Sequence, residues 1–207
     1  MSTSTTTKII NLKSAVIMSA TSLMLLQASC AYGWNPVFVT AESGNMLPTI
    51  KHGSMFVIDH PGRYSKISSG DILAFFYPKN LHVTYIDRVV ATPGDVIKIN
   101  GNILYVNGNQ VPQKYIGTFD YRPEGPGAEG LNIHTKKYGQ ELSGHRFHII
   151  EFNTPEAQMD FGPYKVPNYC YFVMGDDRDN ANDSRFWGCV PKQNILGKIH
   201  LYQLKKQ

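Results

Sequence analysis

The sequence has few of the features that mark several common protein classes. Charged residues make up 17% of the 207 residues, and basic side chains exceed acidic ones by only four. Proteins that bind nucleic acids depend on clustered lysine and arginine, and here those residues are few and scattered. We therefore expect no nucleic-acid partner.

Cysteine is also scarce, with three in the whole chain. Three cysteines are too few for the disulfide framework of a small secreted domain. Cys170 and Cys189 could pair in an oxidising compartment, but their spacing alone does not place the two Cα atoms within bonding range. We therefore take a buried free thiol as the default for each. The histidines show no metal-ligand spacing with cysteine, aspartate or glutamate, so we expect no metal and no cofactor.

Residues 14–31 read SAVIMSATSLMLLQASCA and carry no charge. The residues before them, 1–13, include Lys8 and Lys13 but no acid. A basic flank followed by an apolar stretch is typical of a membrane-targeting segment. The length is near the lower limit of about 17–25 residues that a spanning helix needs.

Three membrane interpretations of this segment compete. We favour a retained signal anchor. The second is a cleaved signal peptide, with small residues at Ala28, Ser29 and Ala31, and the third is a lipoprotein signal that ends at Cys30. A plain buried helix is disfavoured, because nothing before residue 14 could help to cover it. All three membrane interpretations place residues 33–207 on the outer, extracytoplasmic side of a cell membrane.

No long helical period follows residue 32. Short apolar runs rich in aromatic and β-branched residues alternate with glycine, proline, asparagine and aspartate, a pattern typical of strands and tight turns. Asn100-Gly101 and Asn107-Gly108 fit hairpin turns, because these residues tolerate positive φ. The fold class we expect is a mostly β, antiparallel protein. The predicted strands cover residues 54–59, 71–76, 82–90, 96–99, 103–106, 146–152, 169–174 and 195–203.

The chain divides into five expected parts. A basic cytoplasmic N-terminus (1–13) precedes the membrane segment (14–32). A β domain follows in two portions, 33–114 and 169–207. Between them, residues 115–168 are polar and locally rich in proline and glycine, and we interpret them as an insertion or cap with few regular strands.

Three short motifs point to a family. They are S-G-N-M-L-P-T at 43–49, Y-I-D-R-V-V at 85–90 followed by P-G-D at 93–95, and G-D-D-R-D-N-A-N-D-S-R-F-W-G at 175–188. In this order, behind an apolar segment, they resemble the type I (leader) signal peptidase family. The corresponding family motifs are S-G-S-M-x-P-T, Y-I-K-R-x-x-x-x-P-G-D and G-D-N-R-D-N-S-x-D-S-R-x-W-G. The resemblance runs from about residue 37 to the C-terminus and is weakest across the insertion.

The resemblance implies the signal-peptidase β architecture and a serine endopeptidase at the outer membrane surface that removes signal peptides from exported preproteins. In that family a lysine is the general base for the serine nucleophile. A lysine can accept a proton only when burial among apolar groups keeps it neutral. One further serine orients the lysine, and another helps to stabilise the oxyanion.

The match fails at the positions that carry this chemistry. Asn45 stands at the nucleophile position, Asp87 at the general-base position and Ala181 at the base-orienting position. An amide nitrogen is not a nucleophile, because its lone pair is delocalised, and a carboxylate with an ordinary pKa of ~3.9 is a weak base for a hydroxyl. Ser43, at the oxyanion position, is the one member of the site that matches.

The surrounding scaffold motif is intact. The resemblance implies that Asp176, Arg178, Asp183 and Arg185 form ion pairs that hold the site region together. We expect Asp87 to neutralise one of the two arginines. Nucleophile, base and base-orienting residue are absent together while the scaffold is kept, which predicts a retained fold without the hydrolytic step.

We therefore predict a membrane-anchored, non-catalytic signal peptidase I homologue. It would bind signal peptides or pilus-type precursors by strand addition, or assist an active signal peptidase paralogue. The alternative is an active signal peptidase I-type endopeptidase that uses Ser43 with Asp87 as its base. A third interpretation is a structural membrane-surface subunit of a secretion or conjugation apparatus. His82 is disfavoured as a substitute base, because five residues separate it from Asp87 and place it on the opposite strand face.

Overall fold

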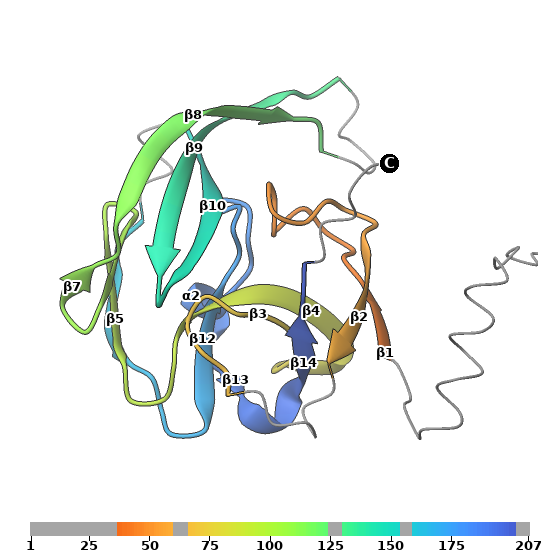
Figure 1. Ribbon diagram of the computed structural model, residues 1–207, viewed down its shortest axis with the longest axis vertical. Coiled ribbons are helices and arrows are strands. Elements are labelled where there is room, and N and C mark those ends of the chain that lie inside the picture. Colours follow the sequence, from red (N-terminus) through yellow and green to blue (C-terminus); the bar gives the residue numbers. More distant parts are fainter. Residues whose placement is uncertain (1–36, 60–65, 124–129, 154–158, 202–207) are drawn as a thin grey trace, which may run out of the picture. The chain divides into compact units, whose positions relative to one another are not determined.

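A computed structural model describes residues 37–59, 66–123, 130–153 and 159–201 (Figure 1). In these ranges the chain forms fourteen strands, one four-residue helix, α2 (Ser184–Trp187), and one 3₁₀ turn, η3 (Lys192–Asn194). Neighbouring strands in every sheet are antiparallel. The predicted mostly β, antiparallel fold is confirmed.

The predicted membrane segment at 14–32 and the basic stretch before it lie outside the described residues. Within the described ranges, no helix is both long enough and apolar enough to cross a membrane. The membrane anchor and the five-part division of the chain therefore stay predictions.

The largest sheet has seven strands in the order β1-β2-β14-β3-β4-β12-β13. Its longest strand, β4, is exposed over its first half and buried over its second half. β3 pairs with β4 over residues 80–88, whereas β12 pairs only with residues 88–91. The bounds are β1 (Val37–Thr40), β2 (Met55–Asp59), β14 (Ile195–Ile199), β3 (Ile72–Tyr77), β4 (Asn80–Ala91), β12 (Cys170–Met174) and β13 (Val190–Pro191).

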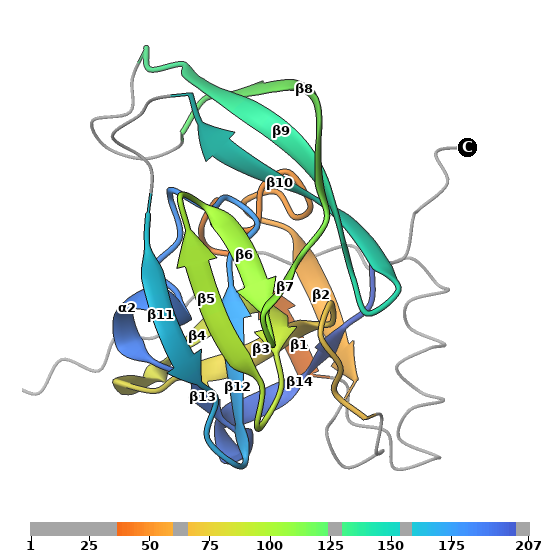
Figure 2. The same cartoon turned by 90° about the vertical axis from the view of Figure 1, so that its left-hand side faces the viewer.

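A four-stranded sheet has the order β11-β5-β6-β7 (Figure 2). Asn107 and Gly108 form its β6–β7 turn with positive φ, as predicted. The β5–β6 turn lies one residue later than predicted, at Gly101-Asn102, because Asn100 itself pairs with Ile103. The bounds are β11 (Phe161–Lys165), β5 (Val96–Asn100), β6 (Ile103–Val106) and β7 (Asn109–Gln110).

A three-stranded sheet, β10-β9-β8, corrects one expectation. β8 (Gln113–Tyr121) and β9 (Ile133–Leu142) are long strands inside a segment expected to contain few. Both are partly exposed along their length, so polar side chains occupy many of their positions and weaken the apolar signal that marks a strand. β10 (His145–Phe152) completes the sheet and agrees with the predicted strand at 146–152.

The three sheets share one core. A single cluster of buried side chains combines residues of all three sheets. Ile97 comes from the four-stranded sheet, Ile149 from the three-stranded sheet, and Val90 and Phe172 from the seven-stranded sheet; each is 0% exposed. This shared core fixes β4, which carries the second motif, relative to β12, which leads into the third motif.

Cys170 and Cys189 form a disulfide, with a Cα–Cα distance of 5.7 Å. The default of two free thiols was wrong. Antiparallel pairing of β12 with β13 brings the two segments together, since Cys170 lies opposite Pro191 and Tyr171 opposite Val190. A separation of 19 residues along the chain does not reveal this pairing.

The disulfide should stabilise the domain by restricting the unfolded chain. Closing a loop of this length predicts a loss of about 3 kcal/mol in the free energy of unfolding for Cys170→Ser/Cys189→Ser, measured by urea denaturation. Adding a reducing agent should lower the free energy of unfolding of the native chain to that of the variant, and it should leave the value for the variant unchanged. Identical native and variant curves would contradict the role of the disulfide.

Candidate functional site

The turn before β2 carries Asn45 and is held in place by two buried side chains. Met46, which follows Asn45, is 1% exposed, and Ile50 is 2% exposed. The Ile50 N–H donates to the Met46 carbonyl at 2.8 Å. Both side chains belong to a core cluster of the seven-stranded sheet. The buried Met46 therefore fixes the backbone from which the Asn45 side chain projects.

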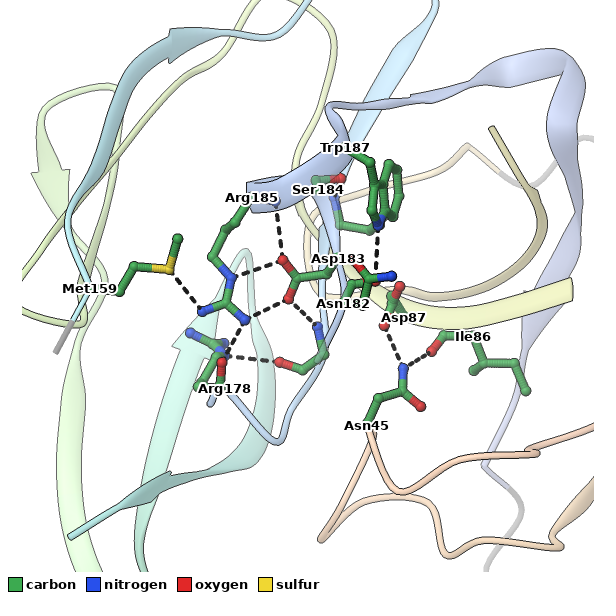
Figure 3. Close-up of polar contacts among 12 residues, drawn as sticks. Asn45, Ile86, Asp87, Met159, Arg178, Asn182, Asp183, Ser184, Arg185 and Trp187 are labelled. Atoms are coloured by element: carbon green, nitrogen blue, oxygen red, sulfur yellow. Dashed lines mark hydrogen bonds and ion pairs between the residues drawn. The ribbon is translucent and has the colours of Figure 1, made fainter. Parts of the chain in front are cut away.

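The Asn45 side chain makes three hydrogen bonds with its neighbours, and Figure 3 shows the two that its Nδ2 donates. Its Nδ2 donates to the Ile86 carbonyl at 2.8 Å and to Asp87 Oδ1 at 2.7 Å. Its Oδ1 accepts a hydrogen bond from the exposed Ser43 hydroxyl at 2.5 Å. Three hydrogen bonds thus hold one amide between the turn and β4.

Asp87 is 0% exposed on β4. Its Oδ1 accepts from Asn45, and its Oδ2 has no hydrogen-bond partner among the described residues. Burial, followed by the nearby charge of Asp183, raises the pKa of Asp87 well above its ordinary value. The hydrogen bond from Asn45 opposes that rise.

The expected neutralisation of Asp87 by an arginine was wrong. In the described part of the chain, Asp87 forms no ion pair with Arg178 or Arg185. Arg185 is paired with Asp183 at 2.8 Å. Arg178 donates to the Gly175 carbonyl at 3.1 Å and to Gln140 Oε1 at 2.9 Å. Both guanidinium groups are already used by other partners.

The loop after β12 lies against Asn45 at Gly175. A Cβ atom at Gly175 would lie 2.4 Å from the Ala181 Cβ and 2.6 Å from the Asn45 carbonyl oxygen. Glycine is therefore needed for this close approach. The Asp177 N–H also donates to the Asn45 carbonyl at 2.9 Å. The structure thus brings Asn45 against Asp87 and places Ala181 beside the same loop residue as Asn45.

Two ion pairs hold this loop. Of the four residues expected in ion pairs, Asp176, Asp183 and Arg185 form them, whereas Arg178 forms none within the described ranges. Asp183 pairs with Arg185 and also accepts from the Gly175 N–H at 3.1 Å. Asp176 pairs with Arg88 through Nε at 2.8 Å and Nη2 at 2.6 Å. Arg88 is the residue after Asp87 in the second motif, but no sequence pattern indicated its partner.

Tyr121 is a second residue that the sequence did not single out. Its hydroxyl donates to Asp177 Oδ2 at 2.8 Å, from β8 to the loop after β12. Asp177 is 0% exposed, and its Oδ1 has no hydrogen-bond partner in the described ranges. Burial raises the pKa of Asp177 to about 7. Because 56 residues separate Tyr121 from Asp177, only the folded chain shows this contact.

Other features that could contribute to a functional site would be His82, a cavity or a group of metal ligands. His82 is exposed on the outer half of β4. Two cavities of about 1040 and 870 Å³ lie elsewhere, and neither is lined by Asn45 or Asp87. Among the described residues, no three histidine, cysteine, aspartate or glutamate side chains are grouped so that they could hold a metal ion.

Comparison with known proteins agrees with the three motifs. The family model described as "Signal peptidase, peptidase S26" matches residues 12–203. Signal peptidase I of Pseudomonas fluorescens is 35% identical over 182 residues, which cover 75% of this chain and 60% of that protein. Signal peptidase I of Aquifex aeolicus is 32% identical over 184 residues, which cover 77% of this chain and 72% of that protein.

The chain spans about three fifths of the length of the Pseudomonas relatives. A crystal structure of a signal peptidase I from Enterococcus faecalis aligns with 66% of this chain and 98% of that chain, at 21% identity and a TM-score of 0.39. The predicted resemblance is confirmed by the family match and the sequence relatives.

The buried Asp177 carboxyl predicts a loss of stability as pH rises. Its pKa is about 7 in the fold against an ordinary 3.8, so the folded chain keeps a proton that the unfolded chain releases. The free energy of unfolding should therefore fall between about pH 4 and pH 7, by up to roughly 4 kcal/mol from this group. Asp177→Asn should flatten the profile, as measured by urea denaturation at several pH values.

Asp120→Asn is the matched control. Asp120 lies on β8 like Tyr121, but its side chain is 48% exposed. This variant should keep the native pH dependence. An Asp177→Asn profile as steep as the native one would show that Asp177 ionises normally in the fold.

Proposed function

Because the chain belongs to the peptidase S26 signal peptidase family, we propose that it binds the extended peptides of exported preproteins without cleaving them. The observation that carries this proposal is the arrangement at Asn45. Its amide occupies the nucleophile position and is hydrogen-bonded to Ser43, Ile86 and Asp87 at once. The proposal concerns the region of the longer relatives that aligns with this chain.

The hydrogen bonds around Asn45 argue against hydrolysis. A hydroxyl nucleophile needs a base within hydrogen-bond reach. The Ser43 hydroxyl donates to the Asn45 amide oxygen, and Asp87 accepts from the amide nitrogen. The neutral amide between Ser43 and Asp87 does not carry a proton from one to the other, so Ser43 has no base in contact.

The edge of β4 supports peptide binding. The Val89 N–H donates to the Asp71 carbonyl at 2.8 Å, on the side of β4 that β3 occupies. Backbone groups of successive residues point to opposite sides of a strand, so Thr84 and Ile86 present theirs to the other side. β12 pairs with β4 only from Arg88 onward. No strand of the described residues pairs with this side of β4 before Arg88, and an extended peptide could add along this edge at Thr84.

The surroundings of Asp87 disfavour an ionised carboxylate. Burial raises its pKa most, followed by the charge of Asp183; Asp176 adds to the rise, whereas the hydrogen bond from Asn45 and the charge of Arg185 oppose it. Burial would also favour the neutral form of a lysine at position 87, which is the form that can accept a proton.

Preprotein cleavage in detergent micelles tests the proposal. The native chain should give no site-specific product, whereas Asn45→Ser/Asp87→Lys/Ala181→Ser should cleave. The control variant Asn45→Ser/Ala181→Ser has the nucleophile but lacks the lysine, and it should be slower than the triple variant by about 10²–10⁴-fold. Cleavage by the native chain would overturn the proposal.

Ser43→Ala tests whether any cleavage by the native chain uses Ser43 as its nucleophile. If the native chain cleaves through Ser43 and Asp87, this substitution should abolish the product. A product that persists in Ser43→Ala would exclude that alternative as well. A purely structural subunit would instead show neither cleavage nor binding of a signal-peptide probe.

A further inference from the structure

Asn45 contacts the same strand edge that a peptide would use. Its Nδ2 lies 2.8 Å from the Ile86 carbonyl oxygen, which is on the side of β4 that faces away from β3. In an added antiparallel strand, a backbone N–H of the peptide would donate to this carbonyl. The side-chain amide therefore takes the place of a peptide N–H.

The amide is held firmly in this position. The buried Met46 anchors the turn, and the Asn45 carbonyl accepts from the Asp177 N–H at 2.9 Å. The Ser43 hydroxyl and Asp87 Oδ1 orient the two ends of the amide. The Asn45 side chain thus cannot leave the Ile86 carbonyl without giving up its other hydrogen bonds to β4 and the turn.

The edge is open two residues earlier. Thr84 is exposed, and its backbone groups point to the same side as those of Ile86. No hydrogen bond from the Asn45 side chain reaches Thr84. A peptide can therefore pair at Thr84 without displacing Asn45, but it cannot pair at Ile86.

We propose that Asn45 is a specificity-determining residue that closes the peptide-binding edge of β4 at Ile86 by occupying its carbonyl. A peptide then pairs with β4 only as far as Thr84. This inference rests on the proposed function, because it assumes that the β4 edge binds extended peptides. It assigns to Asn45 a role in setting how far a peptide pairs along the strand.

Peptide affinity across a small set of variants tests the inference. The probe is a fluorescein-labelled synthetic peptide with the alternating small residues of a signal-peptide cleavage region, Ala-x-Ala, measured by fluorescence anisotropy. Asn45→Ala should bind about 10-fold more tightly than the native chain, because one backbone hydrogen bond becomes available to the peptide. Asn45→Leu keeps about the same side-chain size but has no group that can donate to the Ile86 carbonyl, so it should also bind more tightly.

Two controls make the result specific. Asn109→Ala removes an exposed asparagine from β7 in another sheet, and it should bind like the native chain. Thr84→Pro removes an edge N–H, so it should weaken binding in both the native and the Asn45→Ala background. Thermal unfolding of each variant identifies any that fail to fold, and Asn45→Leu replaces Asn45→Ala if that one does.

The outcomes separate this inference from the proposed function. If the native chain binds the probe and the Asn45 variants bind no more tightly, Asn45 does not close the edge, while peptide binding stands. If no folded chain binds, both the edge site and its closure by Asn45 are wrong. If an Asn45 variant binds the probe more tightly than the native chain and Thr84→Pro abolishes this increase in affinity, both the edge site and its closure by Asn45 are supported.

Discussion

The ion pair between Arg88 and Asp176 is the contact on which the candidate site depends. Both side chains are almost completely buried, at 5% and 0% exposure, and Thr49 adds a hydrogen bond to the same carboxylate at 2.5 Å. Arg88 also donates to the Gly70 carbonyl, so one guanidinium joins β4, the loop after β12 and the turn before β3. Breaking a buried pair of this kind by removing one partner costs about 3–5 kcal/mol, because the other charge is left uncompensated.

The loop after β12, which begins at Gly175 and includes Asp176, carries the rest of the site. Its Gly175 permits the close approach of Asn45 and Ala181, and its Asp177 N–H binds the Asn45 carbonyl. At its end, Asp183 pairs with Arg185 and caps α2 by accepting from the Arg185 N–H. The loop after β12 therefore contacts the segment that carries Asn45 near its start and caps α2 at its end.

Buried aspartates outnumber buried arginines around the loop after β12. In the described part of the chain, four aspartates there are 0% exposed, and the guanidinium groups near them come from three arginines. Two of these aspartates, Asp87 and Asp177, have an oxygen without a hydrogen-bond partner and a raised pKa. Protonation of these carboxyls relieves the excess negative charge. The aspartates are Asp87, Asp176, Asp177 and Asp183, and the arginines are Arg88, Arg178 and Arg185.

The sequence by itself determined the family, the antiparallel β class and the approximate place of the eight apolar strands, because motif order and alternating apolar runs are local properties of the chain. It also identified Asn45, Asp87 and Ala181 as departures from the family pattern. Only the tertiary structure shows which groups these side chains contact. The partners of Asp87 and Asp176, the contact of Tyr121 with Asp177, the Cys170–Cys189 bond and the half-exposed strands β8 and β9 all depend on segments far apart in the chain. Such contacts are set by packing and strand register, which leave no signal at short range.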